Sequence, residues 1–499
     1  MHALLKSIAY SNHWVLLWPE LSLIALGFLL LFIGCTQNGA SRSFHTALLA
    51  ILGQGALTLC FGLGLYFQEP LPAMSNFAGL VLHSPQGDVM RFFFMLASLG
   101  VSGLSLPYLH FRPLARPEFY ALLLFISAGL MLLVQSQHFV FLFVALEFVS
   151  IGFYILISYC SYSTLSLEAG MKYLILGAFT SSLLLLGLAL LYGLATTPPF
   201  IMGDGFYFGD LKRFLEAYGS HPMAQLSVIF ILLGLAFKIG AFPFQLWVPD
   251  VYQGAPTPVT AFLATASKAG GIFVLMNLIV GPFAPMGSIV KPLLSVIAIV
   301  TLLLGGIGAL SQRNMKRFLG LSGLSHTAYL LMGLVATYDA IQLTGILIFY
   351  LFAYSLASFL VFGCLAYLSK DTDDVTFNLE DLQLMHRRSP LLAGILTIGL
   401  GSLAGVPPFV GFVAKLLLFI AVFKAKLYCL LSIAILGVVI SIYYYFNWIR
   451  GLFFTREKKE TVATLPVSSV YALCLMILAS LTLAWAFLPQ SFSAFISQP

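Results

Sequence analysis

Three lysines and one glutamate lie inside long apolar stretches of this sequence, where ionisable side chains are uncommon. Lys238 stands in LGLAFKIGAFPF, Lys268 in AFLATASKAGGIF, Lys415 in PPFVGFVAKLLLF and Glu147 in FLFVALEFVSIGF. Placing a charge at the centre of a bilayer costs roughly 2.5–3.5 kcal/mol on insertion scales, so such residues face the protein interior and mark pathways for ions or protons. These four positions predict that the chain moves charge across a membrane.

Buried amines and carboxyls suit proton transfer because their protonation responds to their surroundings. Burial disfavours the charged form of an amine, and a nearby carboxylate favours it again, so a Glu–Lys couple that pairs and separates can load and release a proton. An imidazole, with an ordinary pKa of about 6.5, suits a relay step. His326 stands in the apolar segment GLSGLSHTAYLL, where the alternative is a hydrogen-bonded packing histidine. Neighbouring hydroxyls could hold relay waters, namely Ser322, Ser325, Thr327 and Tyr329.

The composition predicts the elements that must position these residues. The chain has 499 residues, of which 60% are hydrophobic and 8% charged, and its mean hydropathy is +1.00. Apolar runs of about 20 residues recur from end to end, each long enough to cross the hydrocarbon core of a bilayer. We therefore predict an all-α polytopic membrane protein. The predicted spans are 14–34, 44–67, 90–108, 117–135, 138–160, 168–195, 224–248, 257–281, 288–310, 315–336, 340–368, 390–424, 427–449 and 466–488.

Two of these predicted spans contain prolines close to a lysine. Pro243 and Pro249 follow Lys238, and Pro407 and Pro408 precede Lys415. Proline removes a backbone donor and breaks a helix, which hydrocarbon tolerates only where protein or water covers the freed groups. Ordinary kinks are the alternative interpretation. The lysine beside each break favours a functional one.

Interrupted helices at corresponding positions of two halves are typical of transporters built from inverted repeats, with sites near the bilayer midplane. Spans 4–8 and 9–13 would be the two units, and because five helices is an odd number, consecutive units have opposite orientation. We predict N-terminal helices 1–3 in residues 1–112, a first antiporter-like repeat in 113–283, a second in 284–452 and helix 14 in 453–499.

The charged residues outside these runs predict an orientation rather than a nucleic-acid partner, although the formal net charge is +6. Loops after odd-numbered spans carry most of the basic residues, including Lys316 and Arg317, whereas Arg91 is one of the few after even-numbered spans. The positive-inside rule then places both termini in the periplasm. The acidic cluster of Asp371, Asp373 and Asp374 is interpreted as a solvated loop face.

Several long motifs resemble one known family. VPDVYQGAPTPVTAFLATASK at 248–268, QRNMKRFLGLSGLSHTAYLLMGL at 312–334 and SLAGVPPFVGFVAK at 402–415 resemble the antiporter-like membrane subunits of NADH:quinone oxidoreductase, respiratory complex I. EAGMKYLILGAFTSSLLLLGLALLYG at 168–193 and LEDLQLMHRRSPLLA at 379–393 resemble the N-type branch, the bacterial counterpart of mitochondrial subunit 2. Motifs of this length are far more specific than a lone short pattern.

The resemblance implies roles for individual residues. Glu147 and Lys238 match the glutamate of the fifth helix and the lysine of the broken seventh, which would form a proton-loading couple, with a static buried ion pair as the alternative. Lys268 matches the central lysine of the eighth helix. Lys415 matches the lysine of the broken twelfth helix, with snorkelling to an interface as its alternative.

Two further acidic residues have structural alternatives to a role in transport. Glu168 and Lys172, spaced four apart, either form the cytoplasmic mouth of a channel or simply pair on a helix face, which we favour. Asp250, close to Pro249, is interpreted as a cap of the following turn.

The implied function is proton translocation within NADH:quinone oxidoreductase of a bacterial inner membrane. No motif binds a cofactor or metal in this chain, and NADH, FMN, iron–sulfur clusters and quinone would be used by other subunits. The implied partners are the M-type antiporter-like chain, the small K-type chain and the lipid bilayer. The alternatives are a subunit of an Mrp-type cation/proton antiporter, which shares the buried glutamate and lysines, and an idle scaffold.

Overall fold

The predicted spans correspond closely to helices of the protein. The structure, a computed structural model, describes residues 12–36, 40–67, 73–110, 116–198, 204–338, 343–369, 374, 377–454 and 467–487, without the side chains of 40–44 and 110. Within these residues twelve helices are long and apolar enough to cross a membrane, and two shorter apolar helices, Pro222–Lys238 and Pro390–Ala404, stand at the proline-interrupted segments. The prediction of an all-α polytopic membrane protein is confirmed. The division into two inverted repeats stays a prediction.

The long helices follow one another with short connections. In chain order they are η1 (Trp14–Leu17) with α2 (Trp18–Thr36), α3 (Ala40–Phe67), α4 (Pro85–His110), α5 (Arg116–Val134), α6 (Phe139–Ile157), α7 (Thr164–Thr196), α9 (Pro222–Lys238), the continuous α11 (Thr257–Phe262), η2 (Leu263–Ser267) and α12 (Lys268–Val280), α13 (Gly287–Leu310), α14 (Met315–Thr337), α15 (Thr344–Leu368), α17 (Pro390–Ala404), α18 (Val410–Lys424), α19 (Tyr428–Phe453) and α20 (Ser469–Ala484) with η6 (Trp485–Phe487). Helices suit hydrocarbon because most of their backbone groups are hydrogen-bonded within the segment.

The connections contain short elements of their own. These are the antiparallel hairpin of β1 (Met74–Asn76) and β2 (Val81–His83), and the helices α8 (Phe208–Tyr218), α10 (Trp247–Gly254), η3 (Ala284–Met286), η5 (Leu379–Leu382) and α16 (Met385–Arg388). The hairpin packs onto the end of α5, where the Leu82 N–H donates to the Gln135 carbonyl over 2.7 Å.

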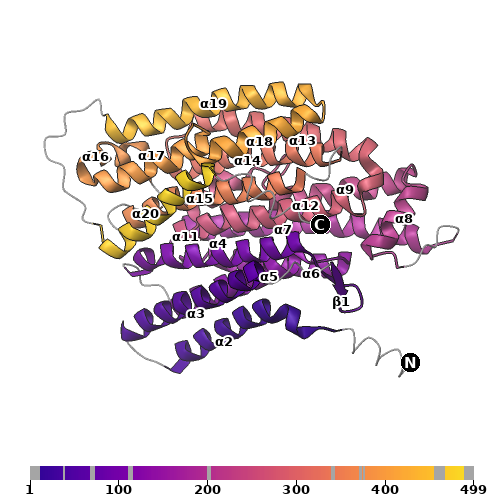
Figure 1. The fold of residues 1–499 in the computed structure, drawn as a ribbon, viewed down its shortest axis with the longest axis horizontal. Helices are drawn as coiled ribbons and strands as arrows, with labels where there is room; N and C mark the ends of the chain where they lie inside the picture. The colour runs from indigo at the N-terminus through magenta and orange to yellow at the C-terminus, as the bar shows by residue number, and fades with distance from the viewer. Residues whose placement is uncertain are drawn as a thin grey trace.

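The helices lie side by side as a bundle, with α2 and α3 along one edge and α19 along the opposite edge (Figure 1). The most enclosed membrane helices are α14, α15 and the α11–α12 helix, so the centre of the chain is where they meet. Lys268 and His326 lie on two of these central helices, and Tyr354 on the third. The bundle therefore holds Lys268 and His326 in its interior.

A buried ion cluster attaches the N-terminal helices to the rest of the bundle. The guanidinium of Arg91 on α4 forms a bidentate contact with Glu20 on α2, both distances being 2.7 Å, and donates to Asp88 over 2.8 Å. Glu20 also accepts from the Gln135 side chain, just beyond α5, over 2.6 Å. The interpretation of Arg91 as a loop charge is wrong, because its side chain is buried and fully paired.

Candidate functional site

Glu147 and Lys238 lie near the same helix but do not touch. The amine of Lys238, the last residue of α9, donates to the Ser150 hydroxyl of α6. The Glu147 carboxylate, also on α6, instead accepts from the Ser181 hydroxyl of α7 over 2.5 Å. No ion pair joins Glu147 to Lys238 within the described part of the chain. Glu147 and Ser150 are three residues apart on α6, so the Lys238 amine is hydrogen-bonded to the same stretch of helix that carries the carboxylate.

The break after Lys238 is stabilised by helices of the second half of the chain. In a continuous helix the Ile239 carbonyl would accept from residue 243, but that residue is proline and has no N–H. The Thr327 hydroxyl of α14 donates to this carbonyl over 3.1 Å. On the other side of the break, the Phe242 N–H donates to the Thr301 hydroxyl of α13 over 2.9 Å. Pro249 lies within the first turn of α10, where a missing N–H costs little.

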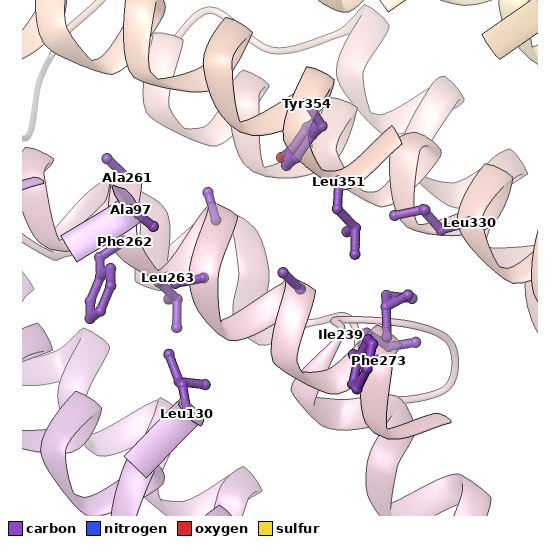
Figure 2. Packing of buried hydrophobic residues seen from close by; sticks show 14 of the residues in the cluster. Ala97, Leu130, Ile239, Ala261, Phe262, Leu263, Phe273, Leu330, Leu351 and Tyr354 are labelled. Atoms are coloured by element: carbon purple, nitrogen blue, oxygen red, sulfur yellow. The ribbon is translucent and has the colours of Figure 1, made fainter. Parts of the chain in front are cut away.

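Lys268 stands where the eighth membrane helix changes its winding. The turn before it, Leu263–Ser267, is π-helical, a feature that occurs often at functional sites. The Lys268 amine donates to the Gly323 carbonyl of α14 over 2.8 Å and lies 5.2 Å from the centre of the Tyr354 ring. Figure 2 shows Tyr354 and Leu351 of α15 on one side of this helix and Leu130 of α5 on the other, among apolar side chains. The ammonium is thus held by one carbonyl and one aromatic face.

His326 is enclosed by tyrosines rather than by the residues next to it in sequence. Its Nδ1 lies 2.8 Å from the Tyr350 hydroxyl, its Nε2 lies 3.4 Å from the Tyr445 hydroxyl, and its ring packs 4.9 Å from that of Tyr354. Among the residues predicted to supply relay hydroxyls, Tyr329 packs its ring edge-on to the imidazole, with 6.2 Å between the ring centres. A cavity of about 10 Å³ lies beside His326, Tyr350 and Tyr354, close to the smallest space that holds one water molecule.

Lys415 caps the second helix break. Pro407 and Pro408 cannot donate to the carbonyls of Leu403 and Ala404 four residues earlier. The Lys415 amine donates to both of these carbonyls, over 2.9 and 2.8 Å. It thereby lies at the C-terminal end of α17, where the helix dipole favours a positive charge. The side chain is only 4% exposed, so it does not snorkel to an interface.

Aromatic rings connect these positions. The Tyr354 ring contacts both Lys268 and His326. The Tyr329 ring contacts His326 and lies 5.5 Å from the Lys415 amine. The structure therefore brings Lys268, His326 and Lys415 into one connected interior path, whereas Lys238 reaches it through the contact of its neighbour Ile239 with α14.

Glu168 and Lys172 belong to a second, partly exposed cluster. They pair over 2.7 Å as their spacing predicts, and Lys172 also contacts Asp250 of α10 over 2.7 Å. Asp250 accepts in addition from Arg317 of α14 over 2.8 Å. The interpretation of Asp250 as a turn cap is wrong, because its carboxylate joins α7 to α14 instead.

The prediction of a solvated acidic loop is wrong for Asp374, whereas Asp371 and Asp373 lie outside the described residues. The Asp374 side chain is buried, accepts from the Tyr108 hydroxyl over 2.7 Å and lies 3.5 Å from the Lys316 amine. Lys316, interpreted from sequence as a loop charge, is fully buried and also donates to the Ala255 carbonyl over 2.6 Å. No local signal predicts this cluster, because its members come from distant parts of the sequence.

The described residues contain no group of three or more histidine, cysteine or acidic side chains placed to hold a metal ion. The six cysteines are free, and those at 160 and 364 are buried. Among the central helices α14, α15 and α11–α12, the predicted relay residues Lys268 and His326 supply an amine and an imidazole, and tyrosine hydroxyls lie beside the imidazole.

Comparison with known proteins gives a consistent result. Residues 136–441 match the family model described as NADH:quinone oxidoreductase/Mrp antiporter, transmembrane. A protein of Opitutus terrae named NADH-quinone oxidoreductase subunit N 1 is 47% identical over 468 residues, which are 92% of this chain and 91% of the relative. A chain in the structure of respiratory complex I from Thermus thermophilus with bound aureothin is 27% identical, with a TM-score of 0.77, covering 96% of this chain and 99% of that chain.

A chain of the Mrp complex from a Dietzia species has the same fold. Its TM-score is 0.80, with 96% of this chain and 97% of that chain covered, but the sequence identity is 18%. The fold is therefore common to both kinds of complex. Sequence similarity, rather than shape, separates them.

Proposed function

The chain belongs to the NADH:quinone oxidoreductase/Mrp antiporter family, among the N-type membrane subunits of the proton-translocating NADH:quinone oxidoreductase, and we propose that its buried amines and imidazole carry the proton. The proposed relay consists of Glu147, Lys238, Lys268, His326 and Lys415. The observation that carries it is the run of contacts from Lys268 through Tyr354 and His326 to Tyr329 and Lys415 within the bundle. A scaffold would not need three lysines that are each at most 8% exposed, since burying each charge is costly.

The separated Glu147 and Lys238 support a loading step. A couple that can pair and separate needs partners for both states, and here the Ser181 and Ser150 hydroxyls hold the carboxylate and the amine apart. Charge-assisted hydrogen bonds of this kind are stronger than neutral ones, so they can compete with direct pairing. We propose that rotation of these two side chains brings the couple together and returns it to the open arrangement.

The proposed assembly places this chain among other subunits of the complex. We propose the M-type antiporter-like chain and the small K-type chain as neighbours, in a bacterial inner membrane with both termini periplasmic. NADH, FMN, iron–sulfur clusters and quinone would be bound by other subunits. The outward faces of α6 and α7, which expose apolar side chains such as Val144, Ile151 and Met171, would contact lipid or these neighbours. Glu147 lies on α6 between such residues, close to this margin.

The test is NADH-driven proton pumping in membrane vesicles from cells carrying wild type, Lys238→Ala or Glu147→Ala. We expect both variants to assemble and to lose proton pumping and coupled quinone reductase activity. Lys424→Ala, an exposed lysine at the end of α18, is the matched control and should pump normally. Assembly is checked on a native gel.

Two outcomes would oppose the proposal. Wild-type turnover and pumping in both variants would favour the scaffold. Sodium-dependent antiport without NADH would favour the Mrp-type function, with which the chain shares its fold.

A further inference from the structure

The hydroxyl of Thr327 lies between two carbonyls of different helices. Its oxygen is 3.1 Å from the Ile239 carbonyl, at the break after α9, and 3.1 Å from the Gly323 carbonyl, one turn earlier on α14. A threonine hydroxyl carries a single hydrogen, so it donates to one of these carbonyls at a time. The two distances are equal and do not favour either acceptor.

Each of the two carbonyls is tied to one of the buried lysines. Ile239 directly follows Lys238, and its carbonyl lacks a helical donor because residue 243 is proline. The Gly323 carbonyl accepts from the Lys268 amine over 2.8 Å. The Thr327 hydroxyl therefore contacts one backbone carbonyl beside each of the two lysines, and Thr327 directly follows His326 in the sequence.

The Gly323 carbonyl has more donors than it can accept. It belongs to the backbone ladder of α14, in which it accepts from the N–H four residues later. A carbonyl has two lone pairs, so this N–H and the Lys268 ammonium together fill it. The hydroxyl is then directed to Ile239. When Lys268 loses its proton, its hydrogen bond to the Gly323 carbonyl becomes a weaker, uncharged one, and the Thr327 hydroxyl can compete with it for that lone pair.

We propose that Thr327 is a positioning residue whose hydroxyl alternates between the Ile239 and Gly323 carbonyls and so couples the state of Lys268 to the helix break beside Lys238. The inference rests on the proposed proton relay. With Lys268 charged, the hydroxyl caps Ile239 and stabilises the break. With Lys268 neutral, the hydroxyl turns to Gly323, and the uncapped Ile239 carbonyl loosens the end of α9. Rotation of one hydroxyl thus supplies a two-state element, which a coupling argument requires.

The test compares Thr327→Val, which keeps the shape but removes the hydroxyl, with Thr327→Ser, which keeps the hydroxyl. Thr337→Val is the matched control, because that threonine is on the same helix, is 1% exposed and donates only within its own helix, to the Leu334 carbonyl over 2.7 Å. The intact complex is assayed in membrane vesicles for NADH-driven pumping and for NADH oxidation, with assembly followed on a native gel. Lys238→Ala is measured alongside.

We expect Thr327→Val to assemble and to lower the rate of pumping about fivefold, which is the factor by which losing one ordinary hydrogen bond changes an equilibrium constant. Thr327→Ser should pump within about twofold of the wild-type rate. Thr337→Val should pump normally. Wild-type pumping by Thr327→Val would overturn the switch, and if Lys238→Ala then fails to pump, the proposed relay itself stands. Wild-type pumping by Lys238→Ala would instead remove the relay on which the switch depends.

A second variant covers the case in which valine prevents assembly. Thr327→Ala also lacks the hydroxyl and introduces no additional bulk, so it is then measured in place of valine. Failure of alanine to assemble, with serine and the Thr337→Val control intact, would identify a static cap and overturn the switch. If Thr327→Ser lost as much pumping as Thr327→Val, the proposed switch would also be overturned, because packing of the threonine methyl group would then explain the loss.

Discussion

Replacing Lys415 and Lys268 by methionine should have very different effects on stability, although both side chains are 4% exposed. Lys415→Met leaves the carbonyls of Leu403 and Ala404 without donors, because prolines occupy both positions four residues later. Lys268→Met removes a donor from the Gly323 carbonyl, which keeps its place in the backbone ladder of α14. The two changes therefore differ in the number of orphaned buried carbonyls.

The magnitude follows from the difference between the variants rather than from either alone. Each replacement abolishes the cost of burying an ammonium, which amounts to several kcal/mol, and each removes a contact with a tyrosine ring. These contributions cancel in the comparison. Lys415→Met leaves two buried carbonyls unsatisfied, and Lys268→Met leaves only that of Ile239 once the Thr327 hydroxyl turns to Gly323. At about 1–3 kcal/mol for each carbonyl, Lys415→Met is about 1–3 kcal/mol less stable than Lys268→Met.

The assay uses Cys364 as a local reporter. This thiol is buried on α15 and lies 3.8 Å from the Leu392 carbonyl in the first turn of α17, so it reports loosening of the helix whose opposite end Lys415 caps. The intact complex is heated in steps with a thiol reagent, and labelling of Cys364 is quantified by mass spectrometry. Labelling should begin at a lower temperature in Lys415→Met than in Lys268→Met, which should resemble wild type. Equal labelling profiles for the two variants would refute the capping argument.

Two further predictions concern other buried positions. Arg91→Met should destabilise the chain by about 3–5 kcal/mol, because it leaves the buried Glu20 carboxylate and Asp88 without their cation. The destabilisation is measured as loss of assembled complex on a native gel. Normal thermal stability of that variant would contradict the prediction. Gly405→Ala should displace the Lys415 side chain, because a Cβ at Gly405 would lie 2.7 Å from the Lys415 Cδ. The φ of Gly405 is +80°, and this left-handed conformation costs a non-glycine residue about 1–2 kcal/mol. That variant should resemble Lys415→Met in the Cys364 assay, and wild-type labelling would count against the close contact.

Several features of this protein follow from its sequence alone. The number and limits of the membrane helices are set by apolar runs, because hydrocarbon admits only segments that satisfy their own backbone. The two breaks follow from Pro243 and from the pair at 407–408, since a missing N–H acts on a carbonyl four residues away in the same helix. The interior location of Lys238, Lys268 and Lys415 follows from the cost of exposing a charge to lipid, and the structure agrees.

The partners of these charges were decided only by the tertiary structure. Lys268 donates to a carbonyl 55 residues away, His326 takes Tyr350 and Tyr445, and Thr327 reaches Ile239 across 88 residues. The family resemblance implies that Glu147 and Lys238 form a couple that pairs and separates, and the structure adds a serine hydroxyl beside each of them.

The surroundings of Asp374 were likewise not predictable from the sequence. It was interpreted as solvated, because its loop is acidic, but it is buried against Tyr108 and Lys316. The physical reason is one of range. Hydropathy and proline geometry act within one helix and can be read along the chain, whereas the partner of a buried charge is whichever donor or acceptor another helix brings within about 3 Å of it.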